Sequence, residues 1–194
     1  MSGATIDRYR TMIRQPTYAL WSGKIGAGDF NAMMIDAVEA GLKGAWLAGA
    51  RAAGILPDEM TDREISQMQT DVFNQFQYIP GFAEFIQRGS KANGGKLESL
   101  LPRMNLWVSR YKEFYERGML MAKRDQKQEW FLGATEKHCG SCVKLSGKVK
   151  RSSSWIEADI YPMSPRLECK GYQCACELKP TDKPCSKGRL PSLP

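Results

Sequence analysis

The sequence predicts a mainly α protein with three parts: an N-terminal helical bundle, a small cysteine-rich α+β module and an extended C-terminal tail. Three observations support this prediction. Apolar residues recur at helical spacing through most of the first 127 residues, five of the six cysteines lie between residues 139 and 176, and the last 14 residues are polar and rich in proline. We therefore expect domains at 1–127 and 128–180, followed by a tail at 181–194.

The first half of the bundle contains two predicted helical regions. Residues 5–21 have apolar positions close to a helical period, but Pro16 should kink this segment or divide it into two helices. A glycine-rich loop follows, and Asp29 is placed to cap a long helix that ends near Gly54. This second helix is rich in glycine and alanine, so another helix can approach it closely.

Three further helices are expected before residue 128. The residues T-D-R-E from Thr61 form a capping box at the start of a helix that ends near Tyr78. A short apolar helix should follow Pro80 and Gly81, and residues 88–96 form the most loop-like segment. Residues 97–127 predict the longest remaining helix, with Pro102 in its first turn, because apolar and aromatic residues form a broad helical stripe.

The module after residue 128 should contain β structure. The residues E-W-F-L-G-A at 129–134 predict a short strand that leads into the first cysteine pair. The residues L-S-G-K-V-K-R at 145–151 predict a hairpin-like return with its turn at Ser146 and Gly147.

The cysteines have the spacing of a metal site. Cys139 and Cys142 form a CxxC pair, and Cys174 and Cys176 form a CxC pair about thirty residues later, with Cys169 just before it. Two such pairs can present four thiolates to one ion, which is the requirement of tetrahedral zinc. Cys139, Cys142 and Cys174 are the best-placed ligands, and Cys169 and Cys176 compete for the fourth position. We expect a structural Zn²⁺, because four thiolates leave no coordination position for a substrate.

Other states of these cysteines remain open. His138 and Cys185 are weaker candidate ligands, and a disulfide, a redox pair or unliganded thiols are alternatives to a metal. The N-terminal residues lack the apolar core of a signal peptide, and no apolar run is long enough to cross a membrane. We therefore expect a reducing compartment, in which metal binding is favoured over disulfides.

The positive charge is concentrated at the C-terminal end of the chain. The net charge is +7, and residues 136–194 carry 11 basic and 6 acidic side chains, against 17 and 15 in residues 1–135. Candidate contacts to nucleic acid or to an acidic protein surface are Lys144, Lys148, Lys150 and Arg151. Scattered lysines on a solvated face are the simpler explanation.

Motifs of the common enzyme classes are absent from the sequence. His138 is the only histidine, so a catalytic triad or a multi-histidine metal centre would depend on that one residue. The zinc deaminase pattern lacks its H-x-E, and G-K-I-G-A-G-D lacks the G-K-[ST] of a phosphate-binding loop. We therefore expect a protein that is not an enzyme.

The cysteine-rich segment resembles a known family. It contains W-F-L-G-A-T-E-K-H-C-G-S-C-V-K-L-S-G-K-V-K, then a tryptophan, then S-P-R-L-E-C-K-G-Y-Q-C-A-C-E-L. This order resembles the C-terminal pattern of the phage Mu protein F-like minor head proteins, also called phage head morphogenesis proteins. The matching positions are Cys139, Cys142, Leu145, Gly147, Lys148, Val149, Cys174, Cys176 and Leu178, and the resemblance covers residues 128–180.

The resemblance implies a structural minor head protein of a tailed bacteriophage. Such a protein would contact the portal, the major capsid protein or both, would be part of a symmetric homo-oligomeric assembly, and would act in head assembly or DNA packaging. It would lie in the virion head after passing through the host cytoplasm, with at most non-specific DNA contact and no membrane. The alternative is a zinc-module nucleic-acid-binding protein that is not part of a virion, in which phosphate contacts would make the affinity strongly dependent on salt.

Overall fold

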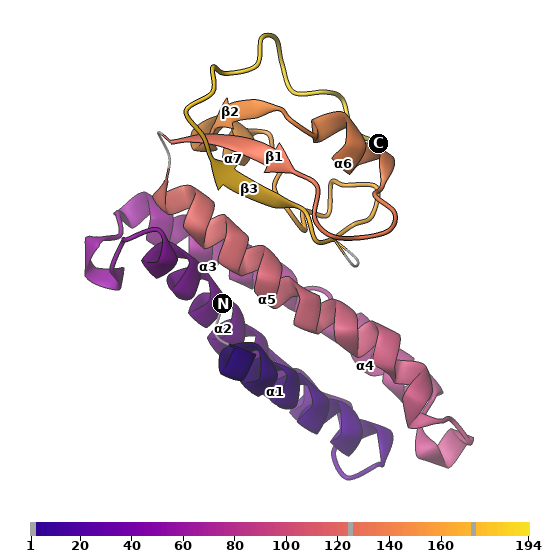
Figure 1. Cartoon of the computed structure of the whole chain (residues 1–194). Helices are drawn as coiled ribbons and strands as arrows, with labels where there is room; N and C mark the ends of the chain where they lie inside the picture. Colours follow the sequence, from indigo (N-terminus) through magenta and orange to yellow (C-terminus); the bar gives the residue numbers. More distant parts are fainter. Residues whose placement is uncertain (1–2, 124–125, 172–173) are drawn as a thin grey trace. The chain divides into compact units, whose positions relative to one another are not determined.

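The computed structural model describes residues 3–123, 126–171 and 174–194, which form two compact units. The first unit comprises residues 1–45 and 61–111, and the second comprises residues 46–60 and 112–194. The chain is mainly helical with one small sheet, which confirms the predicted fold class (Figure 1). The second unit contains all of the cysteine-rich segment.

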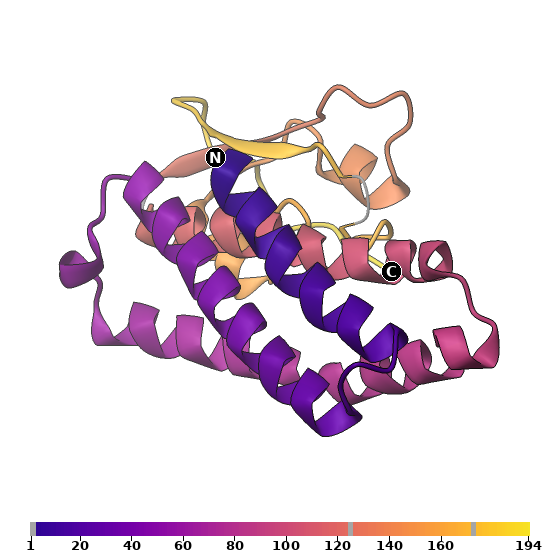
Figure 2. The same cartoon turned by 90° about the horizontal axis from the view of Figure 1, so that it is seen from below.

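The first unit is helical. Its elements are α1 (Gly3–Trp21), the part of α2 (Ala27–Ala52) up to Ala45, α3 (Asp62–Phe76), α4 (Ile79–Arg88) and the part of α5 (Leu101–Ala122) up to Tyr111. Two short 3₁₀ turns, η2 (Lys91–Asn93) and η3 (Leu97–Leu100), join α4 to α5. Neighbouring helices such as α1 and α2 lie side by side in Figures 1 and 2.

The helix starts show where local sequence rules hold. The predicted capping box at Thr61 is confirmed, since the Thr61 hydroxyl accepts a hydrogen bond from Glu64 N–H and the Glu64 carboxylate accepts one from Thr61 N–H. Asp29 is not the cap of α2, because that helix begins at Ala27 and Asp29 lies in its first turn. Pro16 does not divide α1 into two helices, since its buried ring lies within one continuous helix.

Aromatic side chains dominate the core of the first unit. Phe30 from α2 and Phe82 from α4 are buried with their ring centroids 5.8 Å apart, and Phe82 also lies 6.1 Å from the ring of Trp107 on α5. Tyr9 on α1 lies 5.8 Å from Tyr111. These pairs link four helices and explain why the apolar stripes point inwards.

The second unit is built on a three-stranded antiparallel sheet. The strands β1 (Lys127–Phe131), β2 (Val149–Arg151) and β3 (Glu177–Pro180) are arranged in the order β2-β1-β3. Glu129 pairs with Val149 on one side and with Lys179 on the other. The first cysteine pair follows β1 in the chain, and the last cysteines precede β3. Because β1 pairs with β3, the sheet brings the two cysteine segments together.

The hairpin-like return is confirmed, since Ser146 and Gly147 form a turn and β2 pairs antiparallel with β1, but the connection between the strands also contains a short helix. The segment between β1 and β2 contains α6 (Gly140–Leu145), so the first cysteine pair lies at a helix start rather than in a turn between strands. The helix α7 (Ser152–Glu157) follows β2, and η1 (Pro57–Glu59) follows α2.

The long helix α5 ends at Ala122, before the expected limit at 127, and residues 124–125 lie outside the described residues.

Two tryptophans form the centre of the second unit. Trp130 on β1 and Trp155 on α7 are both fully buried, and their ring centroids are 5.7 Å apart. The Trp155 indole N–H donates to the Gln128 carbonyl at 3.3 Å, which ties α7 to β1. Cys142 and Cys176 belong to the same buried cluster, so the cysteine segment is part of the core of this unit.

The C-terminal residues lie against the second unit. Ser186 N–H donates to the Val149 carbonyl at 2.8 Å, and the Ser186 hydroxyl accepts from Val149 N–H at 3.0 Å. Leu190 and Leu193 pack against the buried cluster. Within the described residues, 181–194 contain no helix or strand, so the segment has the extended form expected of it and is held by specific contacts.

None of the helices in the described part of the chain is long and apolar enough to span a membrane.

Candidate metal centre

Three short segments of the second unit position the cysteines. Cys139 is the N-cap of α6, and Cys142 lies in the first turn of that helix. Cys169 lies in the loop after α7, and Cys174 and Cys176 directly precede β3. The pairing of β1 with β3 brings the last two cysteines back to the first pair.

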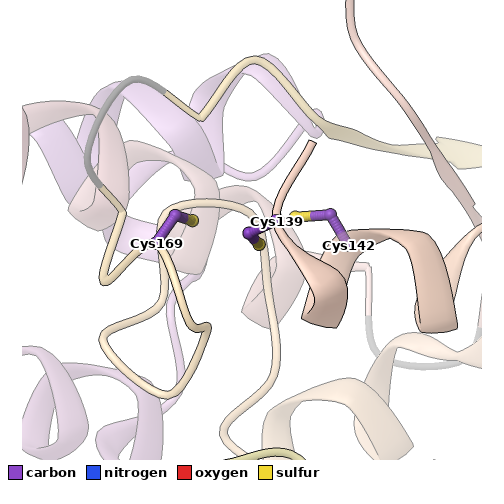
Figure 3. A group of neighbouring side chains, drawn as sticks. All are labelled: Cys139, Cys142 and Cys169. Carbon is purple, nitrogen blue, oxygen red and sulfur yellow. The ribbon is translucent and has the colours of Figure 1, made fainter. Parts of the chain in front are cut away.

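The five sulfurs form two overlapping groups. The Sγ atoms of Cys139, Cys142 and Cys169 lie within 4.8 Å of one another, and so do those of Cys142, Cys174 and Cys176. Figure 3 shows the sulfurs of Cys142 and Cys169 pointing towards Cys139 from opposite sides. Cys142 belongs to both groups and is therefore the centre of the cluster.

These distances suit a tetrahedral thiolate site. Zinc–sulfur bonds of about 2.3 Å place neighbouring sulfurs about 3.8 Å apart, so modest side-chain adjustments close the observed groups around one ion. All five cysteines line the same open pocket. The structure thus brings together all five cysteines between residues 139 and 176, and these residues can hold a metal ion.

Backbone N–H groups already point at several of these sulfurs. Burial opposes the ionisation of Cys139, but hydrogen bonds from the N–H groups of Cys142 and Cys169 hold the pKa of Cys139 below its usual value. Burial raises the pKa of Cys169 to about 12, against the opposing effect of a hydrogen bond from Gly171 N–H. Such donors stabilise thiolates, which are the form that binds metals.

Cys142 and Cys174 are joined by a hydrogen bond between their side chains. A hydrogen bond from the Cys142 thiol lowers the pKa of Cys174 to about 5, with further donors in the N–H groups of Cys176 and Met163. The same hydrogen bond raises the pKa of Cys142, because ionising it would place two negative sulfurs side by side. Burial raises the pKa of Cys176 as well. A metal ion would replace the remaining thiol protons, so its binding must release protons and weaken at low pH.

Glu168, which precedes Cys169, links the loop after α7 to the start of α6. Its carboxylate accepts a hydrogen bond from Gly140 N–H at the start of α6 at 2.6 Å, and its own N–H donates to the Ser141 hydroxyl at 3.0 Å. Ser141 is 1% exposed. The sequence analysis selected neither residue, although each directly adjoins a candidate cysteine in the sequence.

The approach of the residues after β1 to the CxC segment requires a glycine. A Cβ atom on Gly133 would lie 1.9 Å from the Ala175 carbonyl oxygen. The N–H of Gly133 also hydrogen-bonds to Cys176. A side chain at residue 133 would therefore push the CxC segment away from Cys142.

The two weaker candidates differ in position. His138 lines the cysteine pocket, and its Nδ1 atom lies 3.9 Å from Cys176 Sγ and 3.1 Å from the Thr135 hydroxyl oxygen. Cys185 is exposed and belongs to neither group of sulfurs. His138 is thus a neighbour of the cluster, whereas Cys185 is outside it.

The four predicted basic contacts do not share one environment. Lys144, Lys148 and Arg151 have exposed side chains. The Lys150 ammonium donates to the carbonyls of Ser186 at 2.7 Å and Gly188 at 2.5 Å. Lys150 therefore holds the C-terminal segment in place within the protein.

Comparisons with known proteins give no match: neither a family model nor a curated protein nor a solved structure corresponds to this chain.

Proposed function

We propose that the cysteine cluster is a structural zinc site that closes the second unit. The supporting observation is the convergence of five sulfurs from three segments on one pocket. Thiolate ligands favour zinc over magnesium or calcium, and four of them fill its coordination shell. Cys139, Cys142 and Cys174 bind the ion with Cys169 or Cys176 as the fourth ligand. The site stabilises the fold and leaves no position for a substrate, and together with the lack of enzyme motifs in the sequence this supports a protein that is not an enzyme.

Metal analysis of the purified chain tests this proposal. We expect about one zinc per chain in native mass spectrometry of protein purified without added metal. Replacement by Co²⁺ should give the absorption bands of tetrahedral thiolate coordination. Zinc far below one per chain, or a thermal melt that a strong chelator leaves unchanged, would contradict the structural zinc site.

We further propose that the chain is a structural minor head protein of a tailed bacteriophage. The support is the order of residues in 128–180, which resembles the minor head proteins, together with the cysteine positions of that pattern converging in one cluster. In this function the protein attaches to the portal or the major capsid protein as part of a symmetric assembly, and it acts in head assembly or DNA packaging.

The test is the location of the protein in infected cells and purified particles. Mass spectrometry of purified virions should detect the chain at few copies per particle. Deletion of its gene should lower the yield of filled heads, and expression of the parent chain should restore it. Absence from virions, together with normal head assembly after deletion, would contradict the head function even if the zinc site is confirmed.

A nucleic-acid-binding protein outside a virion is the second candidate. The exposed side chains of Lys144, Lys148 and Arg151 lie close together in the sequence around β2 and favour it. In this case the affinity for DNA should fall steeply as salt rises, because phosphate contacts release counterions. Lys144→Glu and Lys148→Glu should each weaken binding and reduce the salt dependence, whereas Lys91→Glu in the first unit should leave both unchanged.

A further inference from the structure

The first unit contains an open aromatic pocket beside two arginines. The pocket lies between α4, α5 and the junction of α3 with α4, and its volume is about 160 Å³. The residues used below are Tyr78, Phe82, Arg103, Leu106, Trp107 and Arg110. All of them belong to the first unit, so the pocket is independent of the metal centre.

The pocket has a buried floor and an exposed apolar rim. Phe82 and Trp107 form the floor and are 1% and 7% exposed. Tyr78 and Leu106 stand at the rim and are 57% and 47% exposed. Single exposed apolar residues are common on protein surfaces, but exposed residues that gather around a hollow are typical of binding sites.

The size of the pocket limits what it can hold. An engineered protein cavity of about 150 Å³ binds one benzene molecule. The pocket of about 160 Å³ therefore admits one aromatic ring or one large aliphatic side chain. It is too small for a nucleotide or for a folded segment, so it suits a single side chain that a longer partner inserts.

The charge beside the pocket determines which type of residue lies next to the inserted side chain in the partner. Both charged residues of the lining are arginines. The Arg103 guanidinium lies 4.9 Å from the centre of the Phe85 ring, which positions it, and it forms no ion pair with any residue that the structure describes. A guanidinium binds a carboxylate through two parallel hydrogen bonds. The pocket therefore favours an apolar side chain that is followed or preceded by an acidic residue.

We propose that this pocket is the docking site for an acidic segment of another protein. The segment inserts one aromatic or large aliphatic side chain between Tyr78 and Leu106 and places a carboxylate on Arg103. This inference goes beyond the proposed function, which assigns no contact to the first unit. The local charge of Arg103, and not the net charge of the chain, favours the acidic residue of the partner.

Selection of short random peptides on the whole zinc-loaded chain tests the proposal. The selected peptides should share Phe, Trp or Leu next to Asp or Glu. A synthetic peptide of that sequence should lose affinity by about tenfold or more for Leu106→Asp and for Arg103→Glu, because the pocket anchor and the charge pair are each lost. Exchanging the acidic residue of the peptide for lysine should restore its binding to Arg103→Glu.

A matched control separates the pocket from general surface charge. Leu56 in the second unit is also 47% exposed, so Leu56→Asp makes the same change outside the pocket lining and should leave peptide binding unaltered. Each variant is first compared with the parent by its thermal melt. Tyr78→Ser replaces Leu106→Asp if that variant melts early.

Two results would overturn the proposal. One is a set of selected peptides that lacks either the apolar or the acidic residue, or that binds the pocket variants as tightly as the parent. The other is a concentration-dependent dimer in sedimentation that Leu106→Asp disperses, since the occupant is then a second copy of this chain.

Discussion

Cys142 occupies a special position among the candidate ligands. It is the one cysteine common to both groups of sulfurs, and it is 2% exposed within the core of the second unit. It also donates the hydrogen bond that lowers the pKa of Cys174. Loss of Cys142 therefore removes one sulfur from each of the two groups.

We expect Cys142→Ser to lower zinc affinity at least about a hundredfold, because the loss of one thiolate opens the coordination shell. The melting temperature of the second unit should fall with it. A competition titration with a chromogenic chelator measures the affinity. Cys185→Ser is the matched control, since Cys185 is exposed and outside the cluster. Equal zinc affinity for the two variants would contradict the proposed ligand set.

Glu116 makes the stability of the second unit depend on pH. Burial raises the pKa of this α5 carboxyl from 4.5 to about 7, although Lys112 acts in the opposite direction. The folded protein therefore binds the Glu116 proton more tightly than the unfolded chain. This contribution to stability therefore falls as pH rises from about 4.5 to about 7.

Glu116→Gln should accordingly stabilise the protein by about 1 to 3 kcal/mol at pH about 8, and by less at pH about 5, because each pKa unit corresponds to about 1.4 kcal/mol. Urea unfolding with zinc present at both pH values measures the difference. The exposed Glu157→Gln variant is the control and should show no comparable gain. A gain that does not grow with pH would show that Glu116 is not the group responsible.

At the scale of elements, the glycines of α2 have two different roles. A Cβ atom on Gly49 would lie 2.0 Å from the Tyr115 carbonyl oxygen on α5, whereas one on Gly44 would meet no atom within 4 Å. Gly49 therefore permits the close approach of two helix segments within the second unit. Gly44 lies in the first unit and has no such neighbour among the described residues.

Alanine substitutions at these two positions should have opposite effects. Gly49→Ala should destabilise the protein by about 1 to 3 kcal/mol, because backbone atoms must move apart. Gly44→Ala should stabilise it by up to about 1 kcal/mol through the higher helix propensity of alanine. Urea unfolding followed by circular dichroism compares them. The same sign of change for both variants would contradict the packing at Gly49.

At the scale of the whole molecule, the C-terminal segment closes the second unit. It adds the Ser186 hydrogen bonds beside β2, the Lys150 contacts and the packing of Leu190 and Leu193. The segment is therefore a structural part of the second unit.

Truncation after Thr181 should lower the stability of the second unit by about 2 to 4 kcal/mol, because buried apolar area and several hydrogen bonds are lost. Tryptophan fluorescence during thermal unfolding reports on this unit when it is measured with Trp21→Phe and Trp107→Phe in every variant, because these two tryptophans belong to the first unit. The double variant Leu190→Ser with Leu193→Ser should reproduce much of the loss, and Ser192→Ala should not. An unchanged melt for the truncated chain would show that these contacts contribute nothing to stability.

The sequence alone predicted the features that depend on near neighbours. Helical periodicity and the capping box at Thr61 are local, because they depend on residues three or four positions apart. The spacing of Cys139 and Cys142 likewise indicated a metal site before any fold was known, since a CxxC turn directs both sulfurs to one point.

Only the tertiary structure decided the features that depend on distant residues. Pro16 remains within a helix although the local rule predicts a break. Asp29 lies in the first turn of α2 and is not its cap, because the helix begins earlier than expected, at Ala27. The strand β3, the tie from Glu168 to Gly140 and the docking of Ser186 on Val149 join residues far apart in the chain. Such contacts form only when packing offsets the entropy of closing long loops, and no short stretch of sequence encodes that balance.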